Sequence, residues 1–311
     1  MKQYLLLLAL LLNYTIVSAQ EKSVYLFSYF MNNGEDGLHL AYSYDGLKWE
    51  ALNNNKSFLT PRVGKDKLMR DPCIIQGPEG NFHMVWTVSW KEKSIGYAFS
   101  EDLIHWSEQK ALPVMEHEQK ARNCWAPEVF YDDDSEQYIV FWSTTIPGRF
   151  PKTEKKGDDG HNHRMYYITT KDFEEISETK LFYDQDFNVI DGTLVKENDE
   201  YILFLKDETR KPPEKNIRIA RSKKLTGKYS KPTKPITGNY WSEGPTPIKI
   251  GEYWYVYFDK YRKHKMGAVR SKDLKDWQDI SDQVSFPEGT RHGTVLKVSH
   301  EMLDKLIKMR N

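Results

Sequence analysis

Apolar and polar residues alternate along several short segments of this chain. Each segment is rich in β-branched or aromatic side chains and is bounded by Gly, Asn or Asp, as β-strands are. A helical pattern covers only Glu301 to Met309. The chain is therefore predicted to be all-β. The strongest strand segments cover residues 24–30, 82–86, 138–142, 201–204 and 253–258.

One short motif recurs five times: a hydroxyl residue, any residue, Asp, and then an aromatic residue a few positions later. Successive copies begin between 49 and 70 residues apart, a period that suits one four-stranded propeller blade better than a helical repeat. Five copies predict five blades. Clear copies run from Ser43 to Trp49, Ser100 to Trp106 and Ser271 to Trp277, and degenerate ones from Thr170 to Phe173 and Ser222 to Tyr229.

A further segment precedes each strong strand and is predicted to be the innermost strand of its blade. The last of these has no room to continue its own blade, whereas the N-terminal region, residues 24–50, has no inner strand ahead of it. We therefore predict an all-β, five-bladed β-propeller, with the ring closed by pairing of N-terminal and C-terminal strands in one blade. The predicted inner strands cover residues 70–75, 125–130, 190–195, 243–248 and 291–296.

The first 19 residues have the pattern of a secretory signal peptide. A basic start at Lys2 leads to the apolar run Leu5 to Leu12 and to the small residues before Ala19, after which we expect cleavage. The run is too short to remain as a membrane span, and no later stretch is apolar enough for one. Residues 20–311 are predicted to form a single propeller domain, exported to the periplasm or secreted.

Charge and cysteine content exclude several other classes of protein. The 45 basic and 45 acidic residues balance, so no overall field attracts nucleic acid or an anionic membrane surface. We expect a monomer. Cys73 and Cys124 are too few for a disulfide-built scaffold, and they are either bonded to each other or two buried free thiols.

Two polar insertions, Pro147 to Arg164 and Asp207 to Asn216, are expected to be loops at a mouth of the propeller. His161 and His163 lie in the first insertion. No accompanying Cys or carboxylate spacing completes a set of metal ligands, so a solvated loop is the favoured interpretation.

The predicted inner strands begin with ionisable residues, and their starts should converge on one central pocket. These residues are Asp71, Glu128, Asp191, Glu243 and His292. Crowded carboxylates disfavour one another's ionisation, a cost that is usually retained for function. Two carboxyl groups flanking a sugar can hydrolyse a glycoside, and a third can raise the pKa of the acid. Asp-Pro and Asp-Gly also make ordinary turns, but their equivalent positions in several blades favour a site.

These motifs, in this order, resemble glycoside hydrolase family 43, the inverting five-bladed propeller enzymes of the arabinofuranosidase and xylosidase type. The resemblance covers essentially the whole mature chain. It implies that Asp71 is the general base, Glu243 the general acid, and Asp191 the carboxylate that tunes and orients the acid, with no cofactor required for the chemistry. The motifs are Arg70-Asp71-Pro72, Trp125-Ala126-Pro127-Glu128, Ile190-Asp191-Gly192, Glu243-Gly244-Pro245 and Arg291-His292-Gly293.

The resemblance also implies contacts around the sugar. Trp125, Glu128 and Arg291 are candidate substrate-binding residues, as is the aromatic Trp86. His292 would match an axial histidine that helps to hold a hydrated calcium ion in the central channel. The chain departs from the family in having Glu128 where Asp is usual, and in having Gly after Asp191 where Pro is common.

The implied mechanism is a single displacement, in which Asp71 activates water and Glu243 protonates the leaving oxygen. Water must fit between base and sugar, so the two carboxyl groups should lie about 6.5 to 9.5 Å apart. We expect an exo-acting enzyme on plant polysaccharide side chains, an α-L-arabinofuranosidase, because the two insertions are placed to wall off a pocket. A β-xylosidase or xylan-active enzyme and an exo-β-1,3-galactanase of the same family are the alternatives.

Three other interpretations are weighed against this one. Retaining fructosidases share Arg-Asp-Pro, but they would have Asn-Asp-Pro near the start and Glu-Cys at the acid, and this chain has neither. Propeller phosphorylases acting on mannosides would require phosphate. A carbohydrate-binding propeller without catalysis would need no trio of carboxyl groups.

Overall fold

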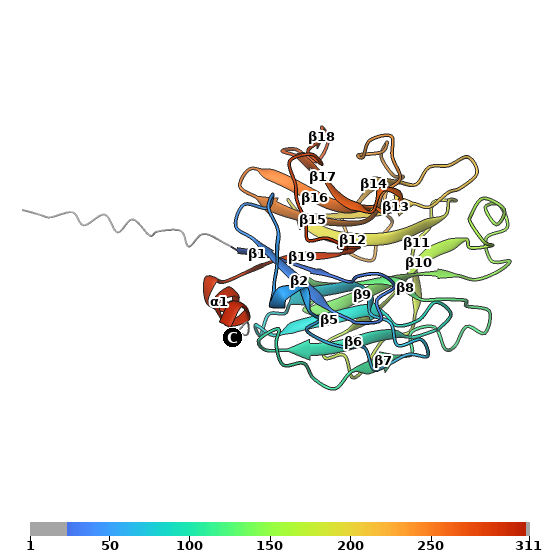
Figure 1. Cartoon of the computed structure of the whole chain (residues 1–311). Helices are drawn as coiled ribbons and strands as arrows, with labels where there is room; N and C mark the ends of the chain where they lie inside the picture. Colours follow the sequence, from blue (N-terminus) through green and yellow to red (C-terminus); the bar gives the residue numbers. More distant parts are fainter. Residues whose placement is uncertain (1–23, 309–311) are drawn as a thin grey trace, which may run out of the picture.

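A computed structural model of the protein describes residues 24–308, which form five small antiparallel sheets around one axis (Figure 1). The prediction of an all-β, five-bladed propeller is confirmed. The expected signal peptide, residues 1–19, lies outside the described residues. None of the helices in the described part is long and apolar enough to cross a bilayer.

Each sheet is one blade, and its strands run from the axis outward in the order given. The blades consist of β4 (Arg70–Gln76), β5 (Phe82–Thr87), β6 (Ile95–Ser100) and β7 (Lys110–Leu112); β8 (Trp125–Asp132), β9 (Gln137–Thr145), β10 (His163–Thr170) and β11 (Lys180–Tyr183); β12 (Val189–Glu197), β13 (Glu200–Asp207) and β14 (Asn216–Ser222); β15 (Glu243–Ile250), β16 (Tyr253–Lys260), β17 (Lys265–Ser271) and β18 (Gln278–Asp279); and β19 (Gly293–Val298), β1 (Val24–Tyr29), β2 (His39–Ser43) and β3 (Glu50–Ala51). Short 3-10 turns cover Asn53–Asn55 and Tyr261–Lys263, and the helix α1 covers His300–Lys308.

The ring closes as predicted, because β1 pairs antiparallel with β19, from Val24 opposite Val298 to Tyr29 opposite Gly293. In Figure 1 the blue N-terminal strand lies beside the red C-terminal one. The inner strands β4, β8, β12, β15 and β19 contact their neighbours in this order, and β19 returns to β4. Pairing the two ends gives both of these strands a hydrogen-bonding partner on the closing blade.

The recurring motif forms the turn that follows the third strand of a blade. In the first copy the hydroxyl of Ser43 accepts the Gly46 N–H at 2.9 Å, and the carboxylate of Asp45 accepts the Lys48 N–H at 2.9 Å. The same pattern recurs at the copies that begin at Ser100 and Thr170. At Ser271 the hydroxyl accepts the N–H of Asp273, and the carboxylate of Asp273 accepts the Asp276 N–H. A side chain that caps its own turn in this way favours the same chain reversal in each blade.

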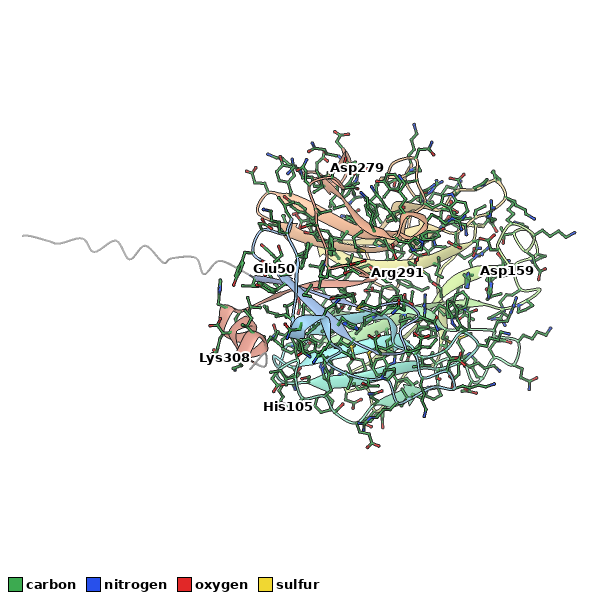
Figure 2. All side chains as sticks on the ribbon, in the orientation of Figure 1. Glu50, His105, Asp159, Asp279, Arg291 and Lys308 are labelled. Atoms are coloured by element: carbon green, nitrogen blue, oxygen red, sulfur yellow. The ribbon has the colours of Figure 1, made fainter. Side chains whose placement is uncertain are left out.

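The aromatic residue of each motif enters the hydrophobic core, which lies as five wedges between adjacent blades. Each wedge receives one of them, and such rings bury large apolar areas. A fully buried side chain of this size contributes about 1.5–3 kcal/mol. The five aromatic residues are Trp49, Trp106, Phe173, Tyr229 and Trp277. Figure 2 shows side chains projecting from every blade, with Asp159, His105 and Asp279 at the periphery.

The blade β12–β14 has three regular strands rather than the predicted four. The segment that follows its motif still hydrogen-bonds to β14, through the N–H groups of Ser230, Thr233 and Ile236. Pro232 and Pro235 lie between these residues and have no N–H to donate, so a regular fourth strand does not form.

Cys73 and Cys124 are both free and buried, which decides between the two alternatives that the sequence left open. The thiol of Cys73 donates to Glu128 Oε2 at 3.2 Å, and Cys124 accepts the Thr144 hydroxyl at 3.9 Å. The two insertions are loops, as predicted, except at their ends. His163 and Arg164 begin β10, Asp207 ends β13 and Asn216 begins β14.

Candidate active site

A backbone bulge lies at the start of four inner strands, where the pairing with the second strand shifts register. At each bulge one residue has left-handed backbone angles, which cost non-glycine residues about 1–3 kcal/mol and cluster at functional sites. Bulges also redirect side chains at sheet ends. The four residues are Asp71 (φ 52°), Ala126 (φ 47°), Asp191 (φ 53°) and Gly244 (φ 61°).

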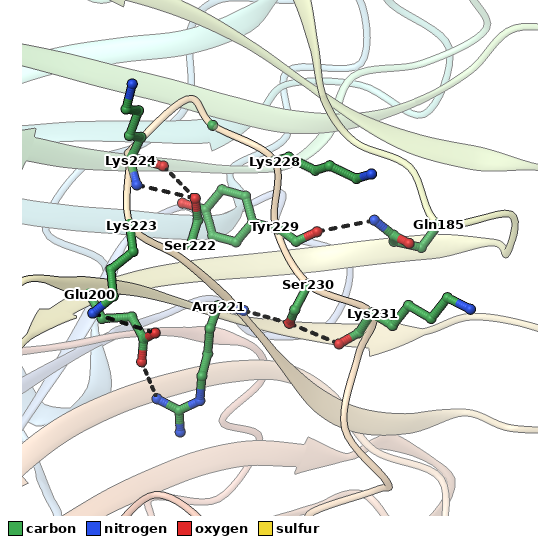
Figure 3. A pocket seen from close by; sticks show the side chains of 11 residues that line it. Gln185, Glu200, Arg221, Ser222, Lys223, Lys224, Lys228, Tyr229, Ser230 and Lys231 are labelled. Atoms are coloured by element: carbon green, nitrogen blue, oxygen red, sulfur yellow. Dashed lines mark hydrogen bonds and ion pairs between the residues drawn. The ribbon is translucent and has the colours of Figure 1, made fainter.

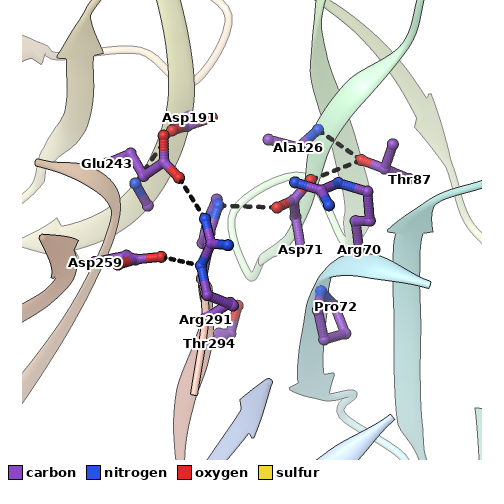
Figure 4. Close-up of polar contacts among 12 residues, drawn as sticks. Arg70, Asp71, Pro72, Thr87, Ala126, Asp191, Glu243, Asp259, Arg291 and Thr294 are labelled. Carbon is purple, nitrogen blue, oxygen red and sulfur yellow. Dashed lines mark hydrogen bonds and ion pairs between the residues drawn. The ribbon is translucent and has the colours of Figure 1, made fainter. Parts of the chain in front are cut away.

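These starts surround a cavity of about 240 Å³ at one end of the axis. Figure 4 shows Asp71 and Glu243 facing this space from opposite sides, on strands of different blades. The structure thus brings together most of the predicted site residues. The lining is formed by Arg70, Asp71, Thr87, Trp90, Trp125, Ala126, Ile190, Asp191, Lys206, Glu208, Glu243 and His292.

Asp71 is held by three groups. Its Oδ1 lies 3.2 Å from His292 Nδ1, and its Oδ2 accepts the Thr87 hydroxyl at 2.9 Å. Burial raises the pKa of Asp71, but the hydrogen bond and charge of His292 and the charge of Arg70 outweigh burial, and the pKa falls to about 2. Burial lowers the pKa of His292 and Asp71 raises it, to about 9. Asp71 is therefore an ionised carboxylate beside an imidazolium ion at neutral pH.

Glu243 lies between two cations. Its Oε2 is 3.0 Å from Lys206 Nζ and its Oε1 is 3.4 Å from Arg291 Nη2, while Arg291 Nε lies 2.5 Å from Asp259 Oδ2. Burial raises the pKa of Glu243, but the charge and hydrogen bond of Lys206 and the charge of Arg291 lower it below its ordinary value. The predicted contact of Arg291 with sugar hydroxyls stays a prediction, since here its guanidinium group binds carboxylates.

Asp191 has the opposite electrostatic balance. Burial and the negative charges of Glu243 and Asp71 raise the pKa of Asp191 to about 6. The positive charges of His292 and Lys206 lower it only in part. Its Oδ2 also accepts the Gly244 N–H at 3.1 Å, so it fixes the backbone directly after Glu243. A Cβ at Gly244 would lie 2.3 Å from the His292 ring, and this position therefore requires glycine.

Glu128 is not among the residues that line this pocket, and its expected contact with substrate stays a prediction. The bulge places Ala126 at the pocket, and Glu128 lies beyond the bulge, further along β8 and away from the pocket. There it borders a separate cavity of about 220 Å³, and the Thr294 hydroxyl donates to its Oε1 at 3.4 Å. Burial raises the pKa of Glu128 to about 7.

Trp86 requires a correction, because its side chain is fully buried in the core between two blades and packs on Gly96. Successive residues of a strand point to opposite faces, so Thr87, not Trp86, faces the pocket. Sequence reasoning missed Trp90, three residues beyond the strand, whose ring lines the pocket and is 41% exposed. The guanidinium carbon of Arg70 lies 4.3 Å from this ring.

Trp125 lines the pocket, as predicted, and stands at the centre of a group of rings. Its ring is perpendicular to that of Trp90 at 5.3 Å, and its indole N–H donates to the Trp90 carbonyl at 3.2 Å. His161 and His163 lie 4.8 Å and 5.2 Å from it and stack on each other. The first insertion is therefore not simply solvated, since it supports an aromatic wall of the pocket.

The two insertions also bind each other. The N–H groups of Arg210 and Lys211 donate to the Lys156 carbonyl, and Asp158 pairs with Lys215 at 2.7 Å. Lys215 pairs in turn with Glu208, whose other oxygen lies 2.6 Å from Lys206 Nζ. A chain of ion pairs thus connects the first insertion to Glu243. No sequence motif marked Lys206, which is 3% exposed and joins residues of two blades.

The calcium ion expected on the axis stays a prediction. His292 does not fit such a site as it lies here, because a protonated imidazole bound to Asp71 has no free lone pair and repels a cation. Among residues 24–308, no group of three or more His, Cys, Asp or Glu side chains could hold a metal ion.

Several solved structures share this fold. An α-L-arabinofuranosidase from Clostridium thermocellum superposes with a TM-score of 0.58 at 13% identity, covering 86% of this chain and 93% of that one. A β-1,3-galactosidase superposes with a TM-score of 0.52 at 16% identity, covering 72% of this chain and 49% of that one. At these identities the likeness concerns the fold alone.

A curated relative, an α-L-arabinofuranosidase of Bifidobacterium longum, is 24% identical over 246 residues. The match covers 67% of this chain and only 23% of the relative, so the chain spans about a quarter of that protein. A family model described as a probable glycosyl hydrolase domain, related to glycoside hydrolase family 43, matches residues 21–304. Because that match takes in nearly the whole propeller, the protein belongs to this family of family 43-related glycosyl hydrolase domains.

Proposed function

We propose that this protein is an inverting, exo-acting glycoside hydrolase that removes α-L-arabinofuranosyl side chains from plant polysaccharides. The observation that carries the proposal is the meeting of Asp71, Asp191 and Glu243, from three blades, in one pocket. Membership of the glycosyl hydrolase family supports the class of reaction. The signal-peptide pattern of residues 1–19 supports action outside the cytoplasm.

Asp71 is the general base. Its low pKa keeps it ionised, and His292 and Thr87 fix both of its oxygens. A carboxylate held in this way can take a proton from a water molecule as that water attacks the anomeric carbon. Attack from the side of Asp71, opposite to Glu243, inverts the configuration at that carbon.

Glu243 is the general acid, and Asp191 controls its proton. The negative charge on either carboxyl opposes ionisation of the other, so the pair retains one proton to a higher pH than an isolated carboxyl would. Asp191 also positions Glu243 through the Gly244 N–H. Without substrate this proton lies on Asp191, whose pKa is about 6, and Glu243 is ionised. The proton passes to Glu243 and from Glu243 to the leaving oxygen, and Lys206 and Arg291 stabilise the carboxylate that remains.

The shape of the pocket supports exo action on a single terminal sugar. A cavity of about 240 Å³ suits one small sugar ring. The second insertion lines it through Glu208, and His161 of the first insertion packs on the lining residue Trp125. The name of the curated relative, α-L-arabinofuranosidase, favours arabinose over the alternative sugars.

The experiment is to assay the purified protein on 4-nitrophenyl α-L-arabinofuranoside, β-D-xyloside and β-D-galactoside, and to follow the first-formed anomer by NMR. We expect the arabinofuranoside to be hydrolysed fastest, with inversion. Faster hydrolysis of the xyloside or galactoside would replace the proposed substrate but keep the mechanism. Retention of configuration would overturn the assignment of Asp71 as base. Tight binding of oligosaccharides without release of reducing sugar would overturn the proposal of an enzyme.

A further inference from the structure

The outer edge of the blade β12–β14 carries a concentration of positive charge that the proposed chemistry does not use. In a chain with no net charge, residues 215–242 contain eight basic residues and no acidic one. Basic side chains at this density on one edge create a local positive potential. Three of the eight, Lys215, Arg218 and Arg221, pair with carboxylates, and Lys215 belongs to the ion-pair chain of the insertions. The other five carry the charge of this edge: Lys223, Lys224, Lys228, Lys231 and Lys234.

Part of this run borders a cavity of about 800 Å³, more than three times the volume of the axial pocket. Figure 3 shows the cavity and the lysine side chains around it. We define this feature as the basic groove. It is lined by Gln185, Glu200, Arg221, Ser222, Lys223, Lys224, Gly227, Lys228, Tyr229, Ser230 and Lys231.

Four lysines in the groove remain available to a ligand. Glu200, the one carboxylate among its described lining residues, pairs with Arg221 at 3.1 Å and lies 3.9 Å from Lys223. Lys223, Lys224, Lys228 and Lys231 are all exposed. Within residues 24–308, the last three have no ion-pair partner.

The frame of the groove is fixed before any ligand binds. Tyr229 is buried, its ring lies 5.3 Å from Phe182, and its hydroxyl donates to the Leu225 carbonyl at 2.9 Å. Gln185 donates to the Tyr229 carbonyl at 3.2 Å, and the Ser230 N–H donates to the Arg221 carbonyl at 2.8 Å. The lysines therefore extend from a rigid edge, which reduces the ordering cost of binding.

We propose that the basic groove binds an acidic polysaccharide, a chain whose sugars carry carboxylates, and so holds the polymer whose side chains the axial pocket trims. The positive charge of the lysines complements regularly spaced uronate groups. Tyr229 is the one aromatic residue among the described residues that line the groove, and it is buried, so a neutral sugar has no exposed ring there on which to stack. Binding is therefore electrostatic. The choice of a polysaccharide rests on the proposed function, whereas the preference for negative charge does not.

The test compares two variants with equal changes in charge. One replaces Lys223, Lys224, Lys228 and Lys231 by Gln, and the matched control replaces four exposed lysines elsewhere. Binding to polygalacturonate is measured by calorimetry at low salt and at about 0.15 M ionic strength. We expect roughly tenfold or greater loss of affinity in the groove variant, little change in the control, and weaker binding at higher salt. The control positions are Lys48, Lys120, Lys171 and Lys297.

Further measurements separate this proposal from the proposed function. The binding assay scores no hydrolysis, so it is informative even if the protein hydrolyses nothing. If the protein is a hydrolase, the groove variant should retain its turnover of a 4-nitrophenyl glycoside and lose apparent affinity only for acidic polymers. Equal loss in the control variant, absence of polygalacturonate binding at low salt, or equally tight binding of duplex DNA would overturn the proposal.

Discussion

Two regions of the propeller axis bury carboxyl groups and treat them differently. At the pocket, Asp71 and Glu243 lie beside His292, Lys206 and Arg291, and their pKa values fall below the ordinary range despite burial. Further along β8, Glu128 contacts a thiol and a hydroxyl, and burial raises its pKa to about 7. At Asp71 and Glu243 the contacts with cations outweigh burial, whereas at Glu128 burial outweighs the charge of the more distant His292.

The difference indicates which carboxyl groups serve chemistry. A buried negative charge is stable only when it is paired, so the cations at the pocket show where the fold retains charge. Among residues 24–308, none of the recorded ion pairs involves Glu128, whose carboxyl group contacts the Thr294 and Cys73 side chains. The charge of His292 acts on it from further away. We interpret Glu128 as a structural carboxyl group, and the predictions below test that division.

The largest effect is expected from removing the charge of the base or the proton of the acid. Asp71→Asn and Glu243→Gln should each lower kcat by about 10³-fold or more, since general acid–base groups contribute up to about 10⁴-fold. Glu128→Gln is the control and should retain turnover within about twofold. Rates are measured on 4-nitrophenyl α-L-arabinofuranoside, and circular dichroism checks folding. Near-native rates in Asp71→Asn, or a comparable loss in Glu128→Gln, would erase the distinction between the two regions.

The sequence predicted the blades and the three pocket carboxyl groups because both depend on local motifs. Asp71, Asp191 and Glu243 stand at strand starts that a propeller must bring together. Glu128 and Trp86 lie outside the pocket lining for a geometric reason. A bulge shifts the strand pairing by one residue, and the amino-acid composition does not reveal where it occurs. The alternation of side chains along a strand decides which of Trp86 and Thr87 faces the pocket.

The cations of the site were harder to predict than the carboxyl groups. Lys206 lies in the second strand of one blade and reaches Glu243 in the first strand of the next. Such a contact depends on the spacing between blades, which no short motif records. Trp90 lies beyond the end of its strand, in a loop whose path the sequence does not specify.

The second prediction concerns stability. The folded protein keeps a proton on Glu128 that the unfolded chain releases, so the free energy of unfolding should fall as pH rises from about 4.5 to about 7. In Glu128→Gln this fall should be smaller, by on the order of 3 kcal/mol at most. Urea unfolding at several pH values measures it, with the exposed Glu79→Gln as control. Parallel curves for Glu128→Gln and wild type would show that Glu128 is charge-compensated like the pocket carboxylates.

The third prediction removes a cation from the pocket. In Lys206→Gln the pKa values of Glu243 and Asp191 should rise, because the positive charge that favoured their ionised forms is gone. The alkaline limb of kcat/KM, which reports loss of the acid's proton, should then move up by about 1 pH unit. Lys249→Gln is the control, since Lys249 lies on the strand of Glu243 but pairs with Glu197. If the alkaline limb of kcat/KM does not move, even with a lower rate, Lys206 serves packing and does not control the pKa of the acid.

The smallest effect is expected from loosening the two insertions. Asp158→Asn removes the charge that pairs with Lys215 and Arg210, and this pair is partly exposed, so stability should change by less than about 1 kcal/mol. KM should rise by about two- to fivefold with kcat unchanged, since the second loop lines the pocket through Glu208 and the first supports Trp125. Asp159→Asn, the exposed neighbour, should leave KM unaltered. A fall in kcat instead would mean that the ion-pair chain through Glu208 and Lys206 acts on the acid itself, and the compensating charges of the pocket would then extend to the loops.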